Sequence, residues 1–417
     1  MSSFDVTSAR SRFPALKQPQ VYFDNAGGSQ TLGSVIDSIC AYLSGTNVQL
    51  GASYAVGQKS TALYGQGYAA AAKYINASPE NIVLGSSTTQ LFRNLSITLA
   101  FPPGSEIIIS KIDHEANIAP WVSMAQNSDL KVKWWTPKTK ENPKLLASDL
   151  KELLSEKTVL VTCTHASNIL GTIHDIKTIA ETVHTIPGAL LCVDAVAYAP
   201  HRKLDMQELG ADFYCFSWYK VRKDPRYLTL ANKWKVYGPH ISMLYASKKG
   251  LEAVKSLGHF FNPSATLADK LGFAGSCYEL TASLPSVIEY FGSNPTEHWD
   301  GIVKHEFELQ SVLINYLNAR SDVTICGETD PDSKKRVSTI SFVVQGKKSQ
   351  DVVEAVDKAT NGEMGIRWGG FYSNRLIEEV LGLDSKDGVV RVSMVHYNTL
   401  EEVNQLLGIF DQVLGKA

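Results

Sequence analysis

The run Ala189-Leu-Leu-Cys-Val-Asp194, followed along the chain by Asp212-Phe-Tyr-Cys-Phe-Ser217-Trp-Tyr-Lys220, decides the fold class. Each run is short and continuously apolar, and polar residues follow it. Continuous apolar runs of this length predict strands buried on both faces, as in a parallel sheet. An acid such as Asp194 at the carboxyl end of such a strand faces the crevice where α/β sheets bind ligands.

Similar apolar runs recur through the first two thirds of the chain, separated by helical patterns. The other runs are Asn81–Leu84, Glu106–Ser110, Lys157–Thr162 and Ile241–Tyr245, and the helical patterns include Thr89–Leu95 and Ile176–Val183. Strands that alternate with helices indicate an α/β fold with a mainly parallel sheet.

The pattern changes after about residue 285. Long amphipathic stretches at 306–318 and 351–359 predict helices, and 337–344 and 389–395 read as strands. Thr399-Leu-Glu-Glu402 has the spacing of a capping box and predicts the start of a final helix. We expect three parts: an N-terminal segment, 1–18, packed on a small α+β C-terminal domain, 285–417, and a large domain, 19–284.

The composition of the chain disfavours several classes of protein. The 417 residues are 44% hydrophobic and 20% charged, with a net charge of −2, which disfavours a nucleic-acid-binding protein. No apolar run is long enough to span a membrane, and the N-terminus lacks the apolar core of a signal peptide. The six cysteines form no CxxC pair, which favours a reducing compartment, so we expect a cytoplasmic protein with no metal site.

Four short motifs could carry chemistry, and each has an ordinary structural explanation. Gly85-Ser-Ser-Thr-Thr89 opens a helix and could bind a phosphate, although a plain helix cap would look the same. Asp194 could keep a pyridinium nitrogen protonated, or could be a turn residue. Lys220 at a strand end is a candidate for Schiff-base formation, but most lysines are merely solvated. His114 could stack on a planar cofactor or move protons, or could be structural.

The order of these motifs resembles the fold-type I pyridoxal-phosphate enzymes, specifically the class V aminotransferase and cysteine desulfurase family. The resemblance runs over nearly the whole chain. It is carried by Val21-Tyr-Phe-Asp-Asn-Ala-Gly-Gly28, Asp113-His-Glu-Ala-Asn117, Ala166-Ser-Asn-Ile-Leu-Gly-Thr172, Val193-Asp-Ala-Val-Ala-Tyr-Ala-Pro-His201 and Val390-Arg-Val-Ser-Met-Val-His-Tyr-Asn-Thr399. It implies a large domain with a mainly parallel, seven-stranded sheet and a smaller α+β C-terminal domain, and it implies pyridoxal 5′-phosphate as cofactor.

The resemblance also implies a role for each matching residue. The catalytic residues would be Lys220, which forms the Schiff base, Asp194, which pairs with the pyridine nitrogen, and His114, which stacks on the ring. Cofactor binding would involve Thr88, Thr89, His114, Asn168, Asp194, Ser217, Tyr219, Lys220 and, reaching the phosphate of a partner subunit, Ser276. Arg391 would bind the substrate carboxylate, and Asn25, Ala26 and Gly27 would form the substrate-side turn. Ser276 therefore predicts a homodimer.

Two departures from the family pattern limit what the resemblance implies. Tyr372 stands where desulfurases of the family carry a loop cysteine, and a tyrosine cannot form a persulfide. In relatives an aromatic-Gly-Pro turn follows the lysine almost at once, whereas here residues 221–235 intervene before Val236-Tyr-Gly-Pro-His240. That segment is an unspliced short intron, a recent insertion or a genuine surface loop. It makes Lys235 a rival to Lys220, which we prefer because of its short spacing from Ser217.

The expected function is that of an enzyme acting on an amino acid through an external aldimine and a Cα carbanion. Transamination or β-elimination at a C–S bond fits best. The alternatives are a desulfurase-like enzyme without the loop cysteine, or a PLP-fold binding protein impaired by the insertion after Lys220.

Overall fold

The computed structural model describes residues 4–219, 237–261, 264–292 and 295–415. A seven-stranded sheet forms the centre of the first two thirds of the chain, in the order β2-β8-β7-β6-β5-β3-β4. Its strands are β2 (Ile82–Gly85), β3 (Glu106–Ser110), β4 (Lys131–Trp135), β5 (Thr158–Thr164), β6 (Leu190–Asp194), β7 (Phe213–Ser217) and β8 (Ser242–Ala246). The strands pair in parallel except for β8, which is antiparallel to both of its neighbours. The expectation of a mainly parallel, seven-stranded sheet is confirmed.

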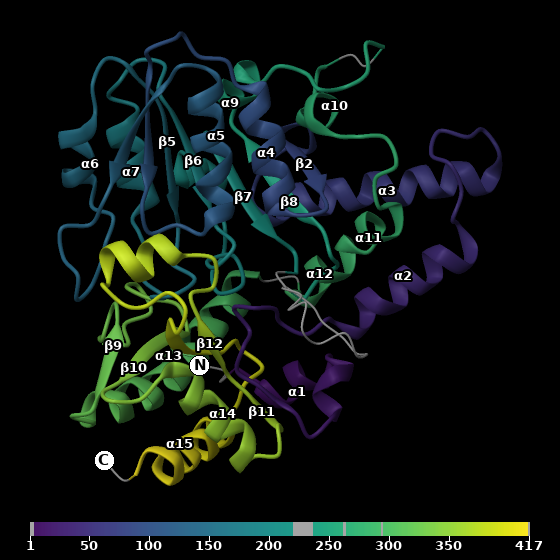
Figure 1. Cartoon of the computed structure of the whole chain (residues 1–417). Coiled ribbons are helices and arrows are strands. Elements are labelled where there is room, and N and C mark those ends of the chain that lie inside the picture. Colours follow the sequence, from purple (N-terminus) through teal and green to yellow (C-terminus); the bar gives the residue numbers. More distant parts are fainter. Residues whose placement is uncertain (1–3, 220–236, 262–263, 293–294, 416–417) are drawn as a thin grey trace.

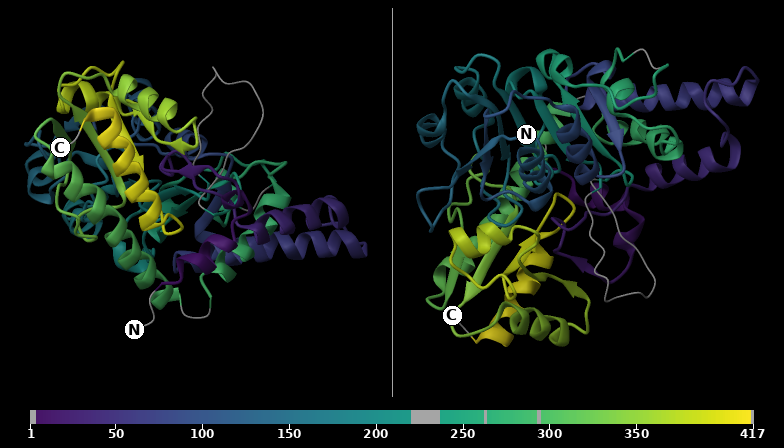
Figure 2. Two further views of the ribbon diagram at one scale, coloured as in Figure 1. Left: turned by 90° about the horizontal axis from the view of Figure 1, so that it is seen from below. Right: turned by 45° about the horizontal axis from the view of Figure 1, so that its top comes forward.

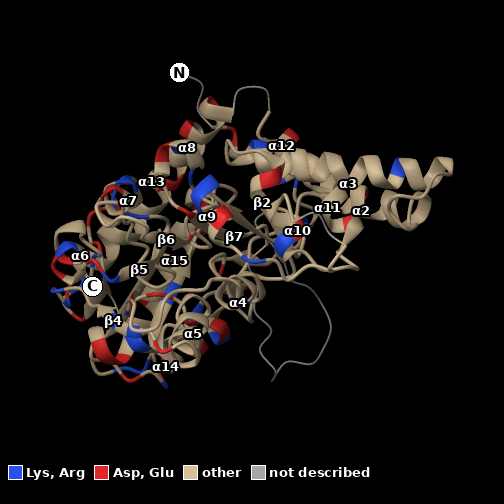
Figure 3. Cartoon of the chain, turned by 90° about the horizontal axis from the view of Figure 1, so that it is seen from above, with Lys and Arg blue, Asp and Glu red and all other residues tan. Residues whose placement is uncertain are grey.

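The central strands are buried on both faces, as their continuous apolar runs predict. Leu191 and Val193 face one hydrophobic core, while Leu190 and Cys192 face another on the opposite side of the sheet. Helices cover both faces (Figure 1). They are α4 (Thr88–Thr98), α5 (Ala119–Asn127), α6 (Ala147–Leu153), α7 (Ile176–Val183), α8 (Met206–Leu209), α9 (Lys248–Ala253) and α10 (Leu267–Leu271). Charged residues lie on the outer helices with both signs interspersed (Figure 3).

A second, antiparallel sheet organises the C-terminal part, in the order β12-β13-β10-β9. It comprises β9 (Val323–Cys326), β10 (Thr339–Val344), β12 (Arg367–Gly369) and β13 (Val389–Ser393), and it packs with α13 (Pro295–Ala319), α14 (Ser349–Ala359) and α15 (Leu400–Leu414) around a core of its own. The predicted capping box at α15 is confirmed, since the Thr399 and Glu402 side chains each accept a hydrogen bond from the other's backbone N–H.

The N-terminal segment lies against this smaller sheet. It contains α1 (Val6–Ser11), a 3-10 turn (Pro14–Lys17) and β1 (Val21–Tyr22). β1 pairs in parallel with β11 (Met364–Gly365), and Arg10 forms an ion pair with Glu402 at 2.8 Å. This pairing brings the turn after residue 22 to the border between the two sheets.

The remaining elements form an arm and several short connections. α2 (Gly33–Gly45) and α3 (Ala55–Tyr74) project from the body as a long hairpin (Figure 2). Near the base of the arm lie α11 (Tyr278–Ala282) and α12 (Leu284–Tyr290), and the short helical turns are Pro79–Asn81, Glu115–Asn117 and, of π type, Leu376–Val380.

A buried ion-pair cluster ties the two parts together. Glu306 of α13 is fully buried and bonds His201 at 3.0 Å and Arg202 at 3.0 Å, both from the loop after β6. Arg202 also donates to the carbonyls of Ser333 and Arg336. Because a buried charge is costly without partners, this cluster couples the stability of the two parts.

We therefore expect Glu306→Ala to lower the free energy of unfolding by about 3 kcal/mol, because it leaves the buried Arg202 unpaired. Thermal unfolding of the purified protein measures this. Glu308→Ala, at an exposed position of the same helix, is the matched control. Equal melting temperatures for the two variants would contradict the role given to Glu306.

Candidate active site

A cavity of about 520 Å³ lies where the carboxyl ends of the main sheet meet the smaller sheet. Most of the site residues predicted from the sequence line it. They are Ala26, Gly27, Thr88, Thr89, His114, Asn168, Asp194, Ser217, Tyr219 and Arg391. These positions span nearly the whole chain, so the fold brings them together from distant segments.

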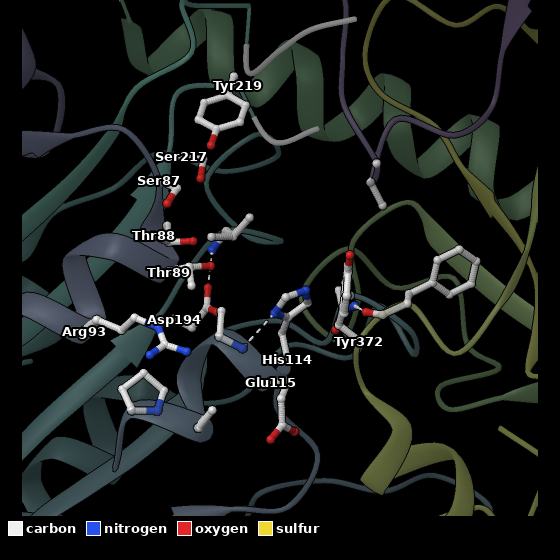
Figure 4. A pocket seen from close by; sticks show the side chains of 18 of the residues that line it. Ser87, Thr88, Thr89, Arg93, His114, Glu115, Asp194, Ser217, Tyr219 and Tyr372 are labelled. Atoms are coloured by element: carbon white, nitrogen blue, oxygen red, sulfur yellow. Dashed lines mark hydrogen bonds between the residues drawn. The ribbon is translucent and has the colours of Figure 1, made fainter. Parts of the chain in front are cut away.

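One end of the cavity is a cradle of hydroxyl and N–H groups. The N-terminus of α4 points into it, with Ser87 as the N-cap and Thr88 and Thr89 in the first turn (Figure 4). The first N–H groups of a helix have no acceptor inside the helix and favour an anion. Ser217, at the end of β7, adds a buried hydroxyl that bonds Ser242 at 2.9 Å. This donor set fits a phosphate group.

Tyr219 closes the cradle on the strand side. Its phenol donates to the carbonyl of Ser86 at 3.1 Å, so it links the end of β7 to the loop before α4. Burial raises the pKa of Tyr219, which keeps the phenol protonated and able to donate.

Asp194 lies at the centre of the cavity as the last residue of β6. Its side chain is 5% exposed, and one carboxylate oxygen accepts the Val196 N–H at 2.9 Å. This hydrogen bond fixes the carboxylate in one orientation. A fixed carboxylate in a pocket suits a protonated ring nitrogen.

In Figure 4, Asp194 lies between His114 and the cradle at α4. His114 caps a short helical turn. Its Nδ1 accepts the N–H of Ala116 at 3.0 Å. In the neutral ring the proton therefore resides on Nε2. The imidazole is held as a flat surface beside the cavity, as a stacking role requires.

Asp113, the residue before His114, is buried below the cavity. Its two oxygens accept hydrogen bonds from the Thr164 N–H at 3.0 Å and the Asn117 amide at 2.7 Å. Burial, together with the nearby charge of Asp194, raises the pKa of Asp113 to about 7. This carboxyl thus holds its proton in the folded chain over a pH range in which it is ionised in the unfolded chain.

That difference sets a pH dependence of stability. Between about pH 4 and pH 7 the folded chain binds more protons than the unfolded chain, so the free energy of unfolding falls as pH rises. Asp113→Asn cannot ionise and lacks this fall. We expect the stability of the variant relative to the native protein to increase from about pH 5 to about pH 8.

Chemical denaturation at the two pH values checks this expectation. The control is Asp351→Asn, at an exposed position, whose effect we expect to stay the same at both. A stability difference for Asp113→Asn that does not change with pH would contradict the assignment.

The opposite end of the cavity is cationic. The guanidinium of Arg391, from β13, is 2% exposed and lies 3.7 Å from the ring centroid of Phe371. It donates to Asp24 at 2.7 Å and to the carbonyl of Asn168 at 3.2 Å, while its Nε–H is buried with no acceptor among the described residues. Burial lowers the pKa of Arg391, and the adjacent Asp24 opposes that shift. A buried guanidinium with an unused donor fits the recognition of a carboxylate.

Asn168 connects the main sheet to the loop that follows β12. Its amide donates to the carbonyl of Phe371 at 3.2 Å and accepts from the hydroxyl of Ser373 at 3.0 Å. One amide N–H remains for a ligand in the cavity. Tyr372, between these two contacts, brings its ring centroid to 5.3 Å from that of His114.

Some predicted residues lie elsewhere. Asn25 is buried outside the cavity, where its amide bonds Tyr22, Ser393, Asn398 and Tyr397, so the structure places it in the support of the substrate-side turn. Ser276 is on the other side of the Gly85–Ser86 loop and bonds Tyr64 at 3.0 Å. Lys220, Lys235 and the segment 221–235 lie outside the described residues.

Sequence reasoning missed several residues of the cavity wall. Arg93, Glu115, Phe371 and above all Arg367 line it. Arg367 lies directly opposite Arg391 in the β12–β13 ladder. β12 has only three residues and leaves no apolar pattern, so no signal in the sequence pointed to it.

The family model for aminotransferase class-V matches residues 21–223 and 229–406. The chain belongs to the class V aminotransferase family. It is therefore a pyridoxal-phosphate-dependent enzyme of the aminotransferase or carbon–sulfur lyase type, and its fold is that of fold-type I. The cradle at α4, the carboxylate of Asp194 and the flat ring of His114 fit the phosphate, ring nitrogen and ring face of that cofactor.

Two curated relatives and two solved structures show how far the likeness extends. The aminotransferase-like protein FGM3 of Gibberella zeae is 53% identical over 99% of both chains. The cysteine desulfurase-like protein ustD of Aspergillus flavus is 38% identical over 98% of this chain and 91% of its own length. Cysteine desulfurases from Thermococcus onnurineus and Escherichia coli superpose with TM-scores of 0.85 and 0.81 at 24% and 25% identity, covering 100% and 99% of each chain.

Among the described residues no helix is long and apolar enough to cross a membrane. The same part of the chain contains no group of three or more His, Cys, Asp or Glu side chains able to hold a metal ion.

Proposed function

We propose that the cavity binds pyridoxal 5′-phosphate at one end and the α-carboxylate of an amino acid at the other. The supporting observation is that an anion cradle at α4, the fixed carboxylate of Asp194 and the buried guanidinium of Arg391 share one cavity. Thr88, Thr89, Ser217 and Tyr219 hold the phosphate. His114 covers the ring face, and Asn168 donates its remaining N–H to the ring oxygen.

When bound, the cofactor supplies an electron sink for the bonds of the substrate Cα. The protein residues make that sink effective. Asp194 keeps the ring nitrogen protonated, because its carboxylate is buried and fixed by the Val196 N–H. Arg391 orients the substrate through its carboxylate, and Lys220 attaches the cofactor and moves the proton at Cα. His114 and Phe371 exclude water from the two sides of the cavity.

Among the reactions open to the family, we propose transamination or β-elimination at a C–S bond. Tyr372 supports this choice over persulfide formation, because its phenol has no sulfur to accept the transferred atom. A panel of amino acids, scored for keto acid, ammonia and sulfide, separates these reactions. Sulfide release from cysteine together with a persulfide on the protein would contradict the proposal.

Lys220 is the proposed attachment site. We expect Lys220→Ala to abolish covalent attachment while leaving the cofactor bound through its phosphate and ring contacts. Lys235→Ala should keep the visible absorbance of the bound cofactor and most of the activity. Borohydride reduction followed by peptide mapping identifies the labelled lysine, and a pyridoxyl label on Lys235 with Lys220 unmodified would show that our assignment is wrong.

We further propose that the functional unit is a homodimer in which Ser276 reaches the phosphate of the partner subunit. Its position supports this, since it is partly exposed on the other side of the loop that carries the cradle. Size-exclusion chromatography of the active protein tests the proposal. Activity confined to a monomer would contradict it.

The cellular location and the domain boundaries are proposals of the same kind. All six cysteines are free, which supports a reducing compartment such as the cytoplasm. The separate core of the smaller sheet supports boundaries near residues 18 and 284, although β1, at Val21–Tyr22, pairs with β11 of the C-terminal part.

A further inference from the structure

Two arginines occupy opposed positions on one face of the smaller sheet. Arg367 and Arg391 are directly paired in the antiparallel β12–β13 ladder, and both line the cavity. Like charges in such a pair repel, so the arrangement is unfavourable unless anions lie between them. In the described structure the one carboxylate bonded to both is Asp24, at 3.3 Å from Arg367 and 2.7 Å from Arg391.

The cavity wall carries an excess of positive charge at the end formed by the smaller sheet. Arg367 and Arg391 contribute two positive charges there, and Asp24 balances one of them. Glu115 does not add to this balance, since it pairs with Arg375 at 3.4 Å. The α-carboxylate of a substrate neutralises the second charge. A second anion at this end therefore depends on the N–H donors that Arg367 leaves unused.

The unused donors are held in place beside Arg391. Arg367 makes one hydrogen bond to Asp24 and is 29% exposed, so most of its fork of N–H groups is open to the cavity. Phe371 lies against both guanidiniums, with centroid distances of 3.7 Å to Arg391 and 5.5 Å to Arg367. An aromatic face of this kind keeps a planar guanidinium in a fixed orientation.

The turn that carries Asp24 is shaped around its carboxylate. A Cβ at Gly27 would lie 2.6 Å from a carboxylate oxygen of Asp24, so only glycine leaves space for that oxygen. Asp24 therefore sets the spacing of the two arginines.

We propose that the substrate of this enzyme is an amino dicarboxylate, with its α-carboxylate on Arg391 and its side-chain carboxylate on Arg367. This inference rests on the proposed function, which supplies the α-carboxylate site. Arg367 is thus a specificity-determining residue that contacts substrate. Arg93 lies on α4 at the cradle end and does not contact the side-chain carboxylate of the substrate.

The test uses the full-length, cofactor-loaded protein and follows ligand binding in two ways, by the change in visible absorbance and by thermal stabilisation. L-Aspartate and L-glutamate are compared with their neutral amides, L-asparagine and L-glutamine, and with L-alanine. At least one acid should bind about ten- to a hundredfold more tightly than its amide, as a charge-assisted hydrogen bond predicts. Arg367→Gln should remove this preference, so that each acid binds no more tightly than its amide, whereas Arg391→Gln should weaken all five ligands.

Three further variants complete the test. Arg367→Lys keeps a positive charge beside Asp24 and should retain the fold with a reduced acid preference. Arg12→Gln, at an exposed position away from the cavity wall, is the matched control and should keep the full preference. Arg93→Gln should also keep it.

The outcomes separate this inference from the proposed function. Equal binding of acids and amides to the native protein would overturn the dicarboxylate assignment, as would a preference that survives Arg367→Gln or is lost in Arg93→Gln alone. Each of these results leaves amino-acid binding itself intact. If none of the five amino acids perturbs the loaded protein, the proposed function fails and this inference fails with it.

Discussion

The buried guanidinium of Arg391 is the interaction on which the cavity depends. Its partners come from three distant parts of the chain: Asp24 from the N-terminal turn, Asn168 from the loop after β5 and Phe371 from the loop after β12. A charge that is 2% exposed is costly unless each of these contacts forms. The N-terminal segment, the main sheet and the smaller sheet therefore close around one cation, and the wall of the substrate end exists only when all three are in place.

The cofactor end follows from strand order. Four adjacent strands of the main sheet, β7, β6, β5 and β3, are parallel, so their carboxyl ends lie along one edge. Each of them delivers one residue just at or beyond its end: Ser217, Asp194, Asn168 and His114, respectively. Because successive strand ends are one strand spacing apart, the residues that we propose for the phosphate, ring nitrogen, ring oxygen and ring face lie at consecutive positions along this edge.

This regularity explains what could be predicted from the sequence and what could not. Buried parallel strands are continuous apolar runs, so β6 and its neighbours, and the polar residues that end them, can be recognised. β4 was not predicted, because it is an edge strand and its sequence, Lys131-Val-Lys-Trp-Trp135, lacks a continuous apolar run. The place of Arg367 in the cavity wall was not predicted, because Arg367 lies opposite Arg391 only through the β12–β13 register, which no local sequence pattern encodes. The packing of Asn25 depends on Tyr397 and Asn398, far along the chain.

The loop that carries Tyr372 shows how the chemistry can vary while the wall stays constant. Phe371 and Tyr372 both have left-handed backbone angles, with φ of 46° and 58°, which costs about 1–3 kcal/mol for each non-glycine residue. The backbone is held there by its carbonyls, since Asn168 donates to Phe371 and the Glu115 N–H donates to Tyr372. Neither hydrogen bond involves the Tyr372 side chain. These two hydrogen bonds can therefore form with another side chain at this position, while Phe371 remains against the two arginines.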